Sequence, residues 1–335
     1  MANIVGTKDS DWIDGTSSAE EIYARAGDDT ISGHGGGDLI FAGAGRDLVL
    51  VAEDDTVSGG RGEDTIFGRR LAGDVEIHAD AGRDTIILSG SSPLGLDSAL
   101  IDGGAGFDTV EFGGQNLIYT MDFVSVERFV FDDTGYEIRA REDQIFDASG
   151  KMKVEVVGAD GDQGFQSLSI LSSDGFLDAS KLVLQNWDAD DFVQLWGDLG
   201  NDEIVGSRYV DALIGFAGDD TLDGAGGADW LSGGAGADTF VIRQSGSDAV
   251  DTIADFVHGE DVVQLDLGRL EPGALGKTAF HIGSSAADGS DRIIYDPETG
   301  ALLYDRDGAG DKFEAIEIAR LDPGLDLSHK DFLVG

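Results

Sequence analysis

A nine-residue period of glycine, aspartate and one aliphatic residue constrains the fold of this chain more than any other feature. Residues 233–241 show the unit almost ideally, with Gly at positions one, two and four, Asp238 at position six and Phe240 at position eight. The aspartate recurs in two blocks, as Asp29, Asp38, Asp47, Asp55, Asp64, Asp84 and Asp108, and again as Asp202, Asp211, Asp220, Asp229 and Asp238. So short a period is typical of a solenoid, in which each repeat packs only on its neighbours.

Position eight predicts how the chain folds within each unit. It carries Ile31, Val49 and Leu222, among others, and one inward residue per nine predicts a three-residue strand whose positions seven and nine point outward. The preceding glycines supply the positive φ angles of a tight turn. Two units then make one turn of a flattened coil, and units of the same parity stack as parallel strands about 4.8 Å apart. We therefore expect an all-β fold, a parallel β-roll or β-helix solenoid.

The same stacking predicts metal sites in the turns. It places Asp29 over Asp47, Asp202 over Asp220, and Asp211 over Asp229, where bare carboxylates would repel. Ca²⁺ removes that cost because it accepts six to eight carboxylate and carbonyl oxygens, whereas Mg²⁺ demands near-ideal octahedral geometry. We predict Ca²⁺ as the cofactor and these aspartates as its ligands: Asp11, Asp29, Asp38, Asp47, Asp64, Asp84, Asp108, Asp191, Asp202, Asp211, Asp220, Asp229 and Asp238.

The charge of the chain supports bound cations and excludes several partners. It has 22 Lys and Arg against 66 Asp and Glu, a formal net charge of −44, so folding without counter-cations is strongly opposed by self-repulsion. Nucleic acid and anionic membrane are excluded as partners on that ground. Cysteine is absent, which leaves neither disulfides nor thiolate metal sites. The first residues form no apolar run, so we expect no N-terminal signal peptide, and no stretch is long enough to span a membrane.

These repeats resemble the RTX (repeats-in-toxin) nonapeptide Gly-Gly-x-Gly-x-Asp-x-aliphatic-x, which binds calcium. The resemblance covers residues 24–67, 79–87, 103–111 and 197–241. It is degraded at 6–14 and at 15–23, where Glu20 stands in place of Asp. The unit 51–58 is one residue short and the unit near 69–77 is irregular, so we expect calcium sites to be weakest beside these two.

Residues 242–335 resemble the C-terminal cap of serralysin-type RTX proteins, on the segments 251–256, 259–265, 294–296 and 303–308. In that family the cap also holds an uncleaved signal read by a type I exporter. The resemblance therefore implies an extracellular, secreted protein without an N-terminal signal peptide. We divide the chain into a first roll block (1–113), an intervening β-segment (114–185), a second roll block (186–241) and the cap (242–335). Segment 114–185 is expected either to continue the solenoid without calcium or to form a separate small β-domain.

No catalytic motif stands out. No two of the five histidines lie four residues apart, so the His-Glu-x-x-His zinc motif is missing, and no Gly-x-Ser-x-Gly is present. This favours a non-catalytic structural, adhesive or polysaccharide-binding protein, with anionic polysaccharide or a cell-surface matrix as partner. The alternative is a polysaccharide lyase or epimerase with its site in 114–185, and a detached tail of a larger protein is a third possibility. Trp12 and Trp230 fall at outward position seven, where they either stack on sugars or shield a strand.

Overall fold

The computed structural model describes residues 1–335 except 70, 72, 90–95, 114–115, 118–120, 132–136, 159–165, 173, 244–248, 269 and 311. The described residues are almost entirely β-structure, with one four-residue α-helix, α1 (Glu142–Ile145), and two short 3₁₀ helices, η2 (Lys277–Ala279) and η3 (His329–Asp331). They form two compact units: unit 1 comprises 1–168 and 183–191, and unit 2 comprises 169–182 and 192–335. The boundary falls inside β20 (Ser167–Leu171), and each unit is described by itself.

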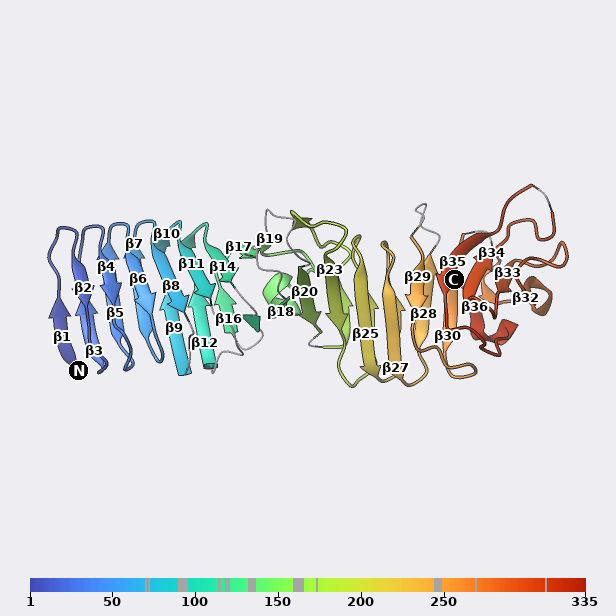
Figure 1. The fold of residues 1–335 in the computed structure, drawn as a ribbon, viewed down its shortest axis with the longest axis horizontal. Coiled ribbons are helices and arrows are strands. Elements are labelled where there is room, and N and C mark those ends of the chain that lie inside the picture. Colours follow the sequence, from blue (N-terminus) through green and yellow to red (C-terminus); the bar gives the residue numbers. More distant parts are fainter. Residues whose placement is uncertain are drawn as a thin grey trace. The chain divides into compact units, whose positions relative to one another are not determined.

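Unit 1 is a parallel β-solenoid whose strands alternate between two sheets (Figure 1). The first sheet runs β1 (Ala2–Val5), β3 (Glu20–Tyr23), β5 (Leu39–Ala44), β7 (Thr56–Arg61), β9 (Gly73–His78), β12 (Leu96–Asp102) and β16 (Met121–Val124). The second runs β2 (Trp12–Asp14), β4 (Thr30–Ser32), β6 (Leu48–Val51), β8 (Thr65–Arg69), β11 (Thr85–Ser89), β14 (Thr109–Gly113), β17 (Arg128–Phe131), β19 (Glu155–Val157) and β22 (Leu184–Gln185). Two short parallel pairs join β10 (Ala81–Gly82) to β13 (Ala105–Gly106), and β15 (Asn116–Leu117) to β18 (Glu137–Arg141).

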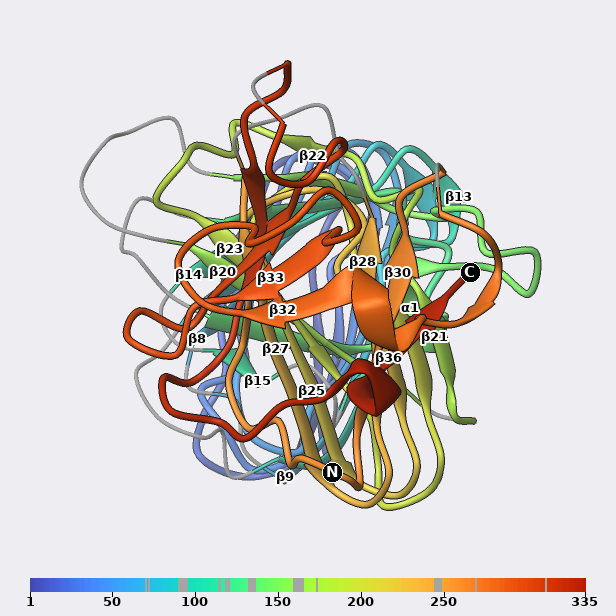
Figure 2. The ribbon, with the colours of Figure 1, turned by 90° about the vertical axis from the view of Figure 1, so that its right-hand side faces the viewer.

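Unit 2 repeats this arrangement and then changes it. One sheet contains β23 (Phe192–Trp196), β25 (Asp211–Ala217), β27 (Trp230–Ala235), β29 (Asp251–Ile253), β35 (Ile316–Arg320), β34 (Ala301–Tyr304), β33 (Ile293–Tyr295) and β32 (Phe280–Ile282). The other contains β21 (Phe176–Asp178), β24 (Glu203–Val205), β26 (Thr221–Asp223), β28 (Thr239–Arg243), β30 (Val262–Asp266), β36 (Phe332–Val334) and β31 (Gly273–Ala274). Pairs β33–β34, β34–β35 and β31–β36 are antiparallel, so regular coiling ends there; Figure 2 looks onto β32 and β33.

The register confirms that two nine-residue units make one turn. Ile13 pairs with Ile31 and Ile31 with Val49, each 18 residues on. The short unit changes the offset to 17, as Val49 pairs with Ile66, and the irregular unit changes it to 20, as Ile66 pairs with Ile86. The strands stay in register because the turns absorb the missing or extra residues.

The prediction of one inward residue per unit is wrong. In β5 Ile40 and Ala42 are both fully buried, and Asp38 just before the strand is 2% exposed. The period-two alternation therefore continues through positions six, eight and one of the next unit. Gly or Ala at position one leaves room for this, because a small side chain fits beneath the inward carboxylate. Strands are accordingly longer than three residues in places, six in β5 and β7.

Segment 114–185 contributes strands close to those predicted over 127–131, 153–157 and 167–171, namely β17, β19 and β20. Thr109 pairs with Arg128, and Arg128 with Glu155, so β17 and β19 continue the second sheet of unit 1. No helix of the described residues has the length and hydropathy to cross a membrane.

Candidate metal centre: the carboxylate ladders

The position-six aspartates form hydrogen-bonded ladders along the inside of the turns. The backbone N–H of Asp29 donates to Asp47 Oδ1 at 2.8 Å, and that of Asp47 donates to Asp64 Oδ1 at 2.9 Å. In unit 2 the N–H of Asp202 donates to Asp220 Oδ1 at 2.7 Å, and that of Asp220 donates to Asp238 Oδ1 at 2.9 Å. One carboxylate oxygen of each rung is thereby held in place by the turn before it.

The other carboxylate oxygen of most rungs is buried without a partner. Besides Asp307 in the cap, nine aspartates of the ladders have a buried side-chain oxygen that accepts no hydrogen bond from any described residue: Asp29, Asp38, Asp47, Asp64, Asp84, Asp108, Asp202, Asp220 and Asp229. A buried, unpaired carboxylate oxygen is costly unless a cation or a proton satisfies it. All nine were predicted as ligands from the repeat alone.

Two kinds of turn are distinguished by the backbone at position two, four residues before the carboxylate. In what we call an open turn, position two has a left-handed φ, as in Arg25 (83°), His34 (73°), Asp80 (72°), Phe216 (77°) and Ala225 (61°). Glycines occupy the same position and conformation before Asp47, Asp64, Asp108 and Asp238. A left-handed non-glycine residue costs about 1–2 kcal/mol, so five of them in equivalent places indicate a compensating interaction in these turns.

In what we call a capped turn, the position-two N–H instead donates to the carboxylate. Thr7 N donates to Asp11 Oδ2 at 2.6 Å, and Ser207 N donates to Asp211 Oδ2 at 2.6 Å. The hydroxyl groups of these two residues donate to the same carboxylates, at 2.9 Å in both turns. Glu20 is capped by Thr16 in the same way. From their own turns, Asp202 and Asp261 accept only the position-two N–H, from Asp198 at 2.8 Å and Val257 at 2.6 Å, and Asp202 keeps its other oxygen buried without a partner among the described residues. Ser or Thr at position two is the sequence signal of a turn that satisfies its own carboxylate.

The predicted ligands therefore differ in the oxygens they have available. Asp11 and Asp211 have carboxylates held by their own turns, and Asp191 accepts from Gln166 N at 2.7 Å and Asp188 N at 2.9 Å. Asp238 is buried in an open turn. Asp55, which we did not predict as a ligand, is fully buried, and its two oxygens accept from Asp38 N and Ala52 N.

The pattern also missed rungs that carry the unit 2 ladder beyond the last glycine repeat. Asp229 N donates to Asp251 Oδ1 at 3.1 Å, and Asp238 N donates to Asp261 Oδ1 at 2.9 Å. Each of these two aspartates stands two residues before an aliphatic residue, Ile253 or Val263, but the unit of each keeps only one of the repeat's glycines. An Asp-x-aliphatic search without glycine would have found them.

Burial makes these carboxyls reluctant to ionise without a cation. It raises the pKa of Asp47, Asp64, Asp84 and Asp238 to about 6 and that of Asp211 to about 7. Burial, followed by the charge of Asp211, also raises the pKa of Asp229. A bound divalent cation would reverse this direction because it favours the ionised form.

The donor set fits a hard cation and requires backbone ligands. No group of three or more His, Cys, Asp or Glu side chains is placed to hold a metal among the described residues, so side chains alone do not complete a site. The turns stack so closely that backbone oxygens face the next turn: a Cβ at Gly236 would lie 1.9 Å from Gly218 O, and one at Gly62 would lie 1.6 Å from Gly45 O. Carboxylate and carbonyl oxygens together are the ligands that calcium prefers.

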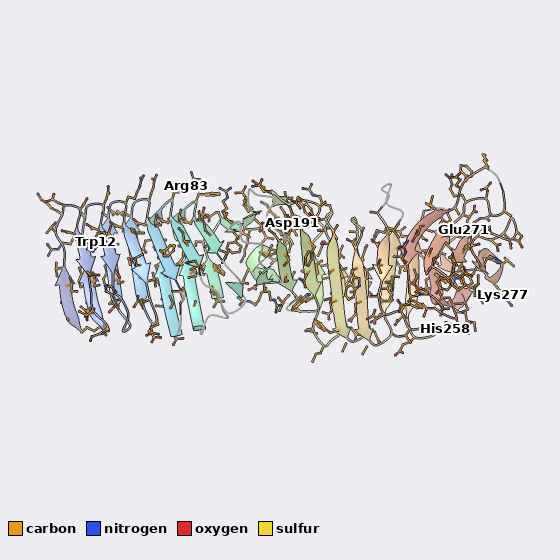
Figure 3. The ribbon with its side chains drawn as sticks, in the orientation of Figure 1. Trp12, Arg83, Asp191, His258, Glu271 and Lys277 are labelled. Carbon is orange, nitrogen blue, oxygen red and sulfur yellow. The ribbon has the colours of Figure 1, made fainter. Side chains whose placement is uncertain are left out.

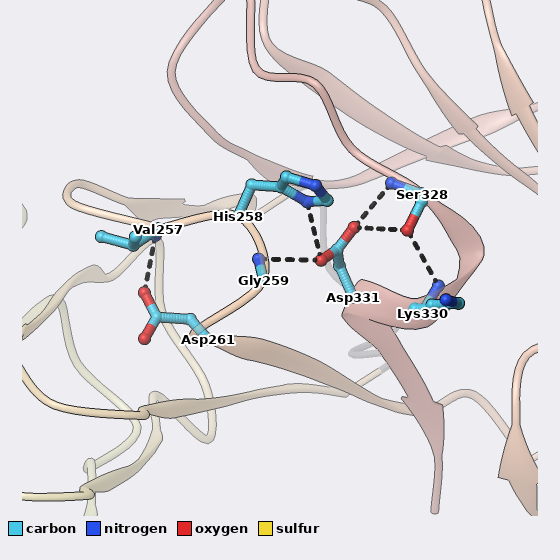
Figure 4. Close-up of polar contacts among 7 residues, drawn as sticks. All are labelled: Val257, His258, Gly259, Asp261, Ser328, Lys330 and Asp331. Carbon is cyan, nitrogen blue, oxygen red and sulfur yellow. Dashed lines mark hydrogen bonds and ion pairs between the residues drawn. The ribbon is translucent and has the colours of Figure 1, made fainter.

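A His–Asp–Ser cluster in unit 2 does not have the geometry of a nucleophilic site (Figure 4). His258 Nδ1 lies 2.9 Å from Asp331 Oδ1, but Ser328 Oγ donates to Asp331 Oδ2 at 3.1 Å and not to the imidazole. Ser328 Oγ also accepts from Lys330 N, which makes it the cap of the short helix before β36. The cluster ties the turn at Gly259 to residues 328–331. In unit 1, the exposed imidazole of His34 has its Nε2 2.5 Å from Asp14 Oδ1.

Comparison with known families identifies the repeats. Residues 14–49, 52–70, 196–231 and 214–241 match the family model of the RTX calcium-binding nonapeptide repeat. The matched segments contain most of the open turns and end before residue 242. No curated protein matches the chain. The repeats are thus calcium-binding repeats, and they form the β-roll predicted from their period.

Proposed function

We propose that this RTX-type protein leaves the cell unfolded, folds outside it when calcium fills the open turns, and there serves as a non-catalytic binding or structural protein for anionic polysaccharide. The observation that carries the proposal is the set of nine buried carboxylate oxygens without a hydrogen-bond partner among the described residues. With a net charge of −44, these turns pack only when cations neutralise them. Binding free energy then becomes folding free energy.

The ligands we propose are the aspartates of the open turns, together with backbone carbonyls of the same and the next turn. Their sites belong to the weak, extracellular class, with dissociation constants of about 10⁻⁴–10⁻³ M. Cytosolic calcium would leave such sites empty. The capped turns at Asp11 and Asp211 are proposed to need no ion, because hydrogen bonds from Thr7 and Ser207 already hold their carboxylates.

Export through a type I system would be compatible with this folding switch. Residues of the cap are engaged when folded: Phe332 is fully buried, and β36 pairs with β30 on one side and β31 on the other. A signal in residues 242–335 would therefore be accessible to an exporter only in the unfolded chain. Because calcium is low inside the cell and high outside, the chain would be exported unfolded and would fold afterwards.

A catalytic role in segment 114–185 receives no support from its described residues. Arg141, a candidate for binding a substrate carboxylate, is held by Asp122 at 2.8 Å and by Asp143 at 3.1 Å. These contacts are those of a structural ion-pair cluster. We therefore propose the non-catalytic role, and incubation with polyuronate tests it: an unsaturated or epimerised product would overturn it.

The calcium switch is tested by far-ultraviolet circular dichroism of the full chain. We expect an unfolded spectrum in chelator, a β-rich spectrum at millimolar Ca²⁺, and little change at equal Mg²⁺, because Mg²⁺ requires octahedral geometry and keeps its waters. Calorimetric titration should give several ions per chain. A β-rich spectrum in chelator at pH 7.5 would refute the switch.

A further inference from the structure

The outer face of the second sheet of unit 1 carries a row of hydroxyl groups that ends in an arginine. Thr65, Thr85 and Thr109 pair directly with one another on β8, β11 and β14, and Thr109 pairs with Arg128 on β17. All of them are partly exposed, because position seven points outward. Parallel strands place successive members of this row about 4.8 Å apart.

A second row runs beside the first, on the turns that precede these strands. Position five of successive turns carries Arg46, Glu63, Arg83 and Phe107. Between the two rows lies a groove of about 630 Å³. It is lined by three arginines (Arg46, Arg83 and Arg128), the three threonines, three carboxylates (Glu63, Asp64 and Glu111) and Val130. Its size is that of an ordinary ligand site, and it crosses the strands along the direction in which the turns stack.

The three arginines of the groove are paired to different degrees. Arg46 Nη2 lies 2.6 Å from Glu63 Oε2, in an exposed ion pair. Arg128 Nε lies 3.3 Å from Glu155 Oε2 but forms no hydrogen bond among the described residues, although this nitrogen is buried. Arg83 (labelled in Figure 3) has no ion pair within the described part of the chain, and its guanidinium carbon lies 5.6 Å from the centre of the Phe107 ring.

Arg83 shares the lack of an ion pair with other described arginines, such as Arg61 and Arg306, and is distinguished from them by its place in the groove. The guanidinium of Arg83 lies against the Phe107 ring at the edge of the groove, and a ring contact leaves the hydrogen-bond donors of the guanidinium available. This arrangement suits an external anion.

We propose that this groove binds a linear polymer of carboxylated sugars, with Arg83 and Arg128 taking carboxylates and the threonine row and Glu111 taking sugar hydroxyls. The arginine fork matches a carboxylate in two parallel hydrogen bonds. The threonine hydroxyls can donate and accept hydrogen bonds, and the Glu111 carboxylate accepts them. Together they provide partners for the hydroxyl groups of a sugar. Because the groups repeat from strand to strand, the groove fits an extended chain better than a compact ligand. The proposal rests on the proposed calcium-dependent fold, since the groove exists only when the turns are stacked.

The test measures binding of a short, fluorescently labelled oligouronate to the full chain in millimolar Ca²⁺. Short oligomers avoid the gel that long polyuronates form with calcium. We expect Arg83→Ala to weaken binding by about tenfold or more, because it removes charge-assisted hydrogen bonds. Arg83→Lys should retain part of the affinity. Arg61→Ala is the matched control, because it removes the same charge from an exposed residue that does not line the groove, and its effect should be under about twofold.

Circular dichroism of each variant separates this proposal from the calcium switch. If the wild type folds with calcium but does not bind the oligouronate, the groove proposal is wrong and the switch stands. Equal losses in Arg83→Ala and Arg61→Ala would show a diffuse charge effect and would also overturn it. Equal binding of a neutral oligosaccharide would refute the role of the carboxylate, and equal binding of a sulfated one would refute the preference for carboxylate over other anions.

Discussion

Two adjacent glycines, Gly226 and Gly227, offer the sharpest test of how the turns stack. Gly227 has a φ of +146°, and a Cβ there would lie 2.1 Å from Tyr209 O and 2.4 Å from Asp229 Oδ1. At Gly226 the nearest atom to an added Cβ is Arg208 Cα, 4.0 Å away, and φ is not left-handed. The same substitution to alanine therefore meets a filled space at one residue and an open one at the next.

The two substitutions are expected to change the free energy of unfolding in opposite directions. Gly227→Ala places a side chain in a backbone region that costs about 1–3 kcal/mol. It also forces an overlap of more than about 1 Å with a carbonyl oxygen, which adds roughly 1–3 kcal/mol as overpacking does elsewhere. Gly226→Ala restricts only the unfolded chain and should stabilise by about 0.4–1 kcal/mol. The two variants should thus differ by about 3 kcal/mol or more in free energy of unfolding.

Urea unfolding of both variants in saturating calcium measures this difference, and a calcium titration in the absence of urea provides a second observable. Because an added Cβ at Gly227 meets Asp229 Oδ1, the acceptor of the Asp211 N–H, its variant should also require more calcium to fold. If both variants unfold within about 0.5 kcal/mol of each other, the turns are not stacked as described.

Three further predictions concern the ladder, its pH dependence and the core. Asp220→Asn should lower the number of bound calcium ions by one or two in calorimetric titration, whereas Asp211→Asn should leave the number unchanged, because Ser207 already satisfies that carboxylate. In chelator, the stabilisation from these carboxyls should be complete below about pH 3.8, and residual β-structure should disappear as the pH rises through about 6. A carboxyl whose pKa is raised from 3.8 to about 6 on folding binds its proton more tightly in the folded chain, as expected of Asp47, Asp64, Asp84 and Asp238. A rise of stability with pH in chelator would contradict this direction. Leu222→Ala, at a fully buried rung between Ile204 and Phe240, should cost about 2–5 kcal/mol, against under about 1 kcal/mol for outward Thr221→Ala, and similar losses would contradict the inward assignment.

The period of the repeat predicts the strands, their parity and most of the ladder. A fixed spacing of nine with an inward aliphatic residue admits few arrangements, so the pairing of Ile13 with Ile31 followed from spacing alone. It did not predict the second inward position, because glycine and alanine at position one carry no hydrophobic signal of their own. Ala42 is fully buried, yet its residue type gives no indication of it.

The division of the turns into open and capped could not be predicted from the aspartates. It depends on one backbone angle at position two, and side chains as different as those of Arg25 and Phe216 adopt the same left-handed conformation there. Only the hydroxyl residues Thr7, Thr16 and Ser207 mark the other conformation in the sequence. The groove could not be predicted from the sequence either. Its rows join residues that are 17 to 24 positions apart, because the period is irregular in this part of the chain.

The capped turns have a consequence for how the protein would respond to rising calcium. The turns capped by a hydroxyl residue stand near the start of each repeat block, at Asp11 and Glu20 in the first and at Asp211 in the second. A stack of turns that interact only with their neighbours behaves as a one-dimensional lattice. A turn that closes without an ion is a fixed boundary of that lattice, because it is folded before any calcium binds. A ladder that begins at such a turn has a template on which the first ion-requiring turn can form, so its growth proceeds from that end by adding ions in sequence. Binding of the first added ion sets the calcium concentration at which folding begins. The length of the uninterrupted run of open turns sets how steeply folding depends on calcium concentration.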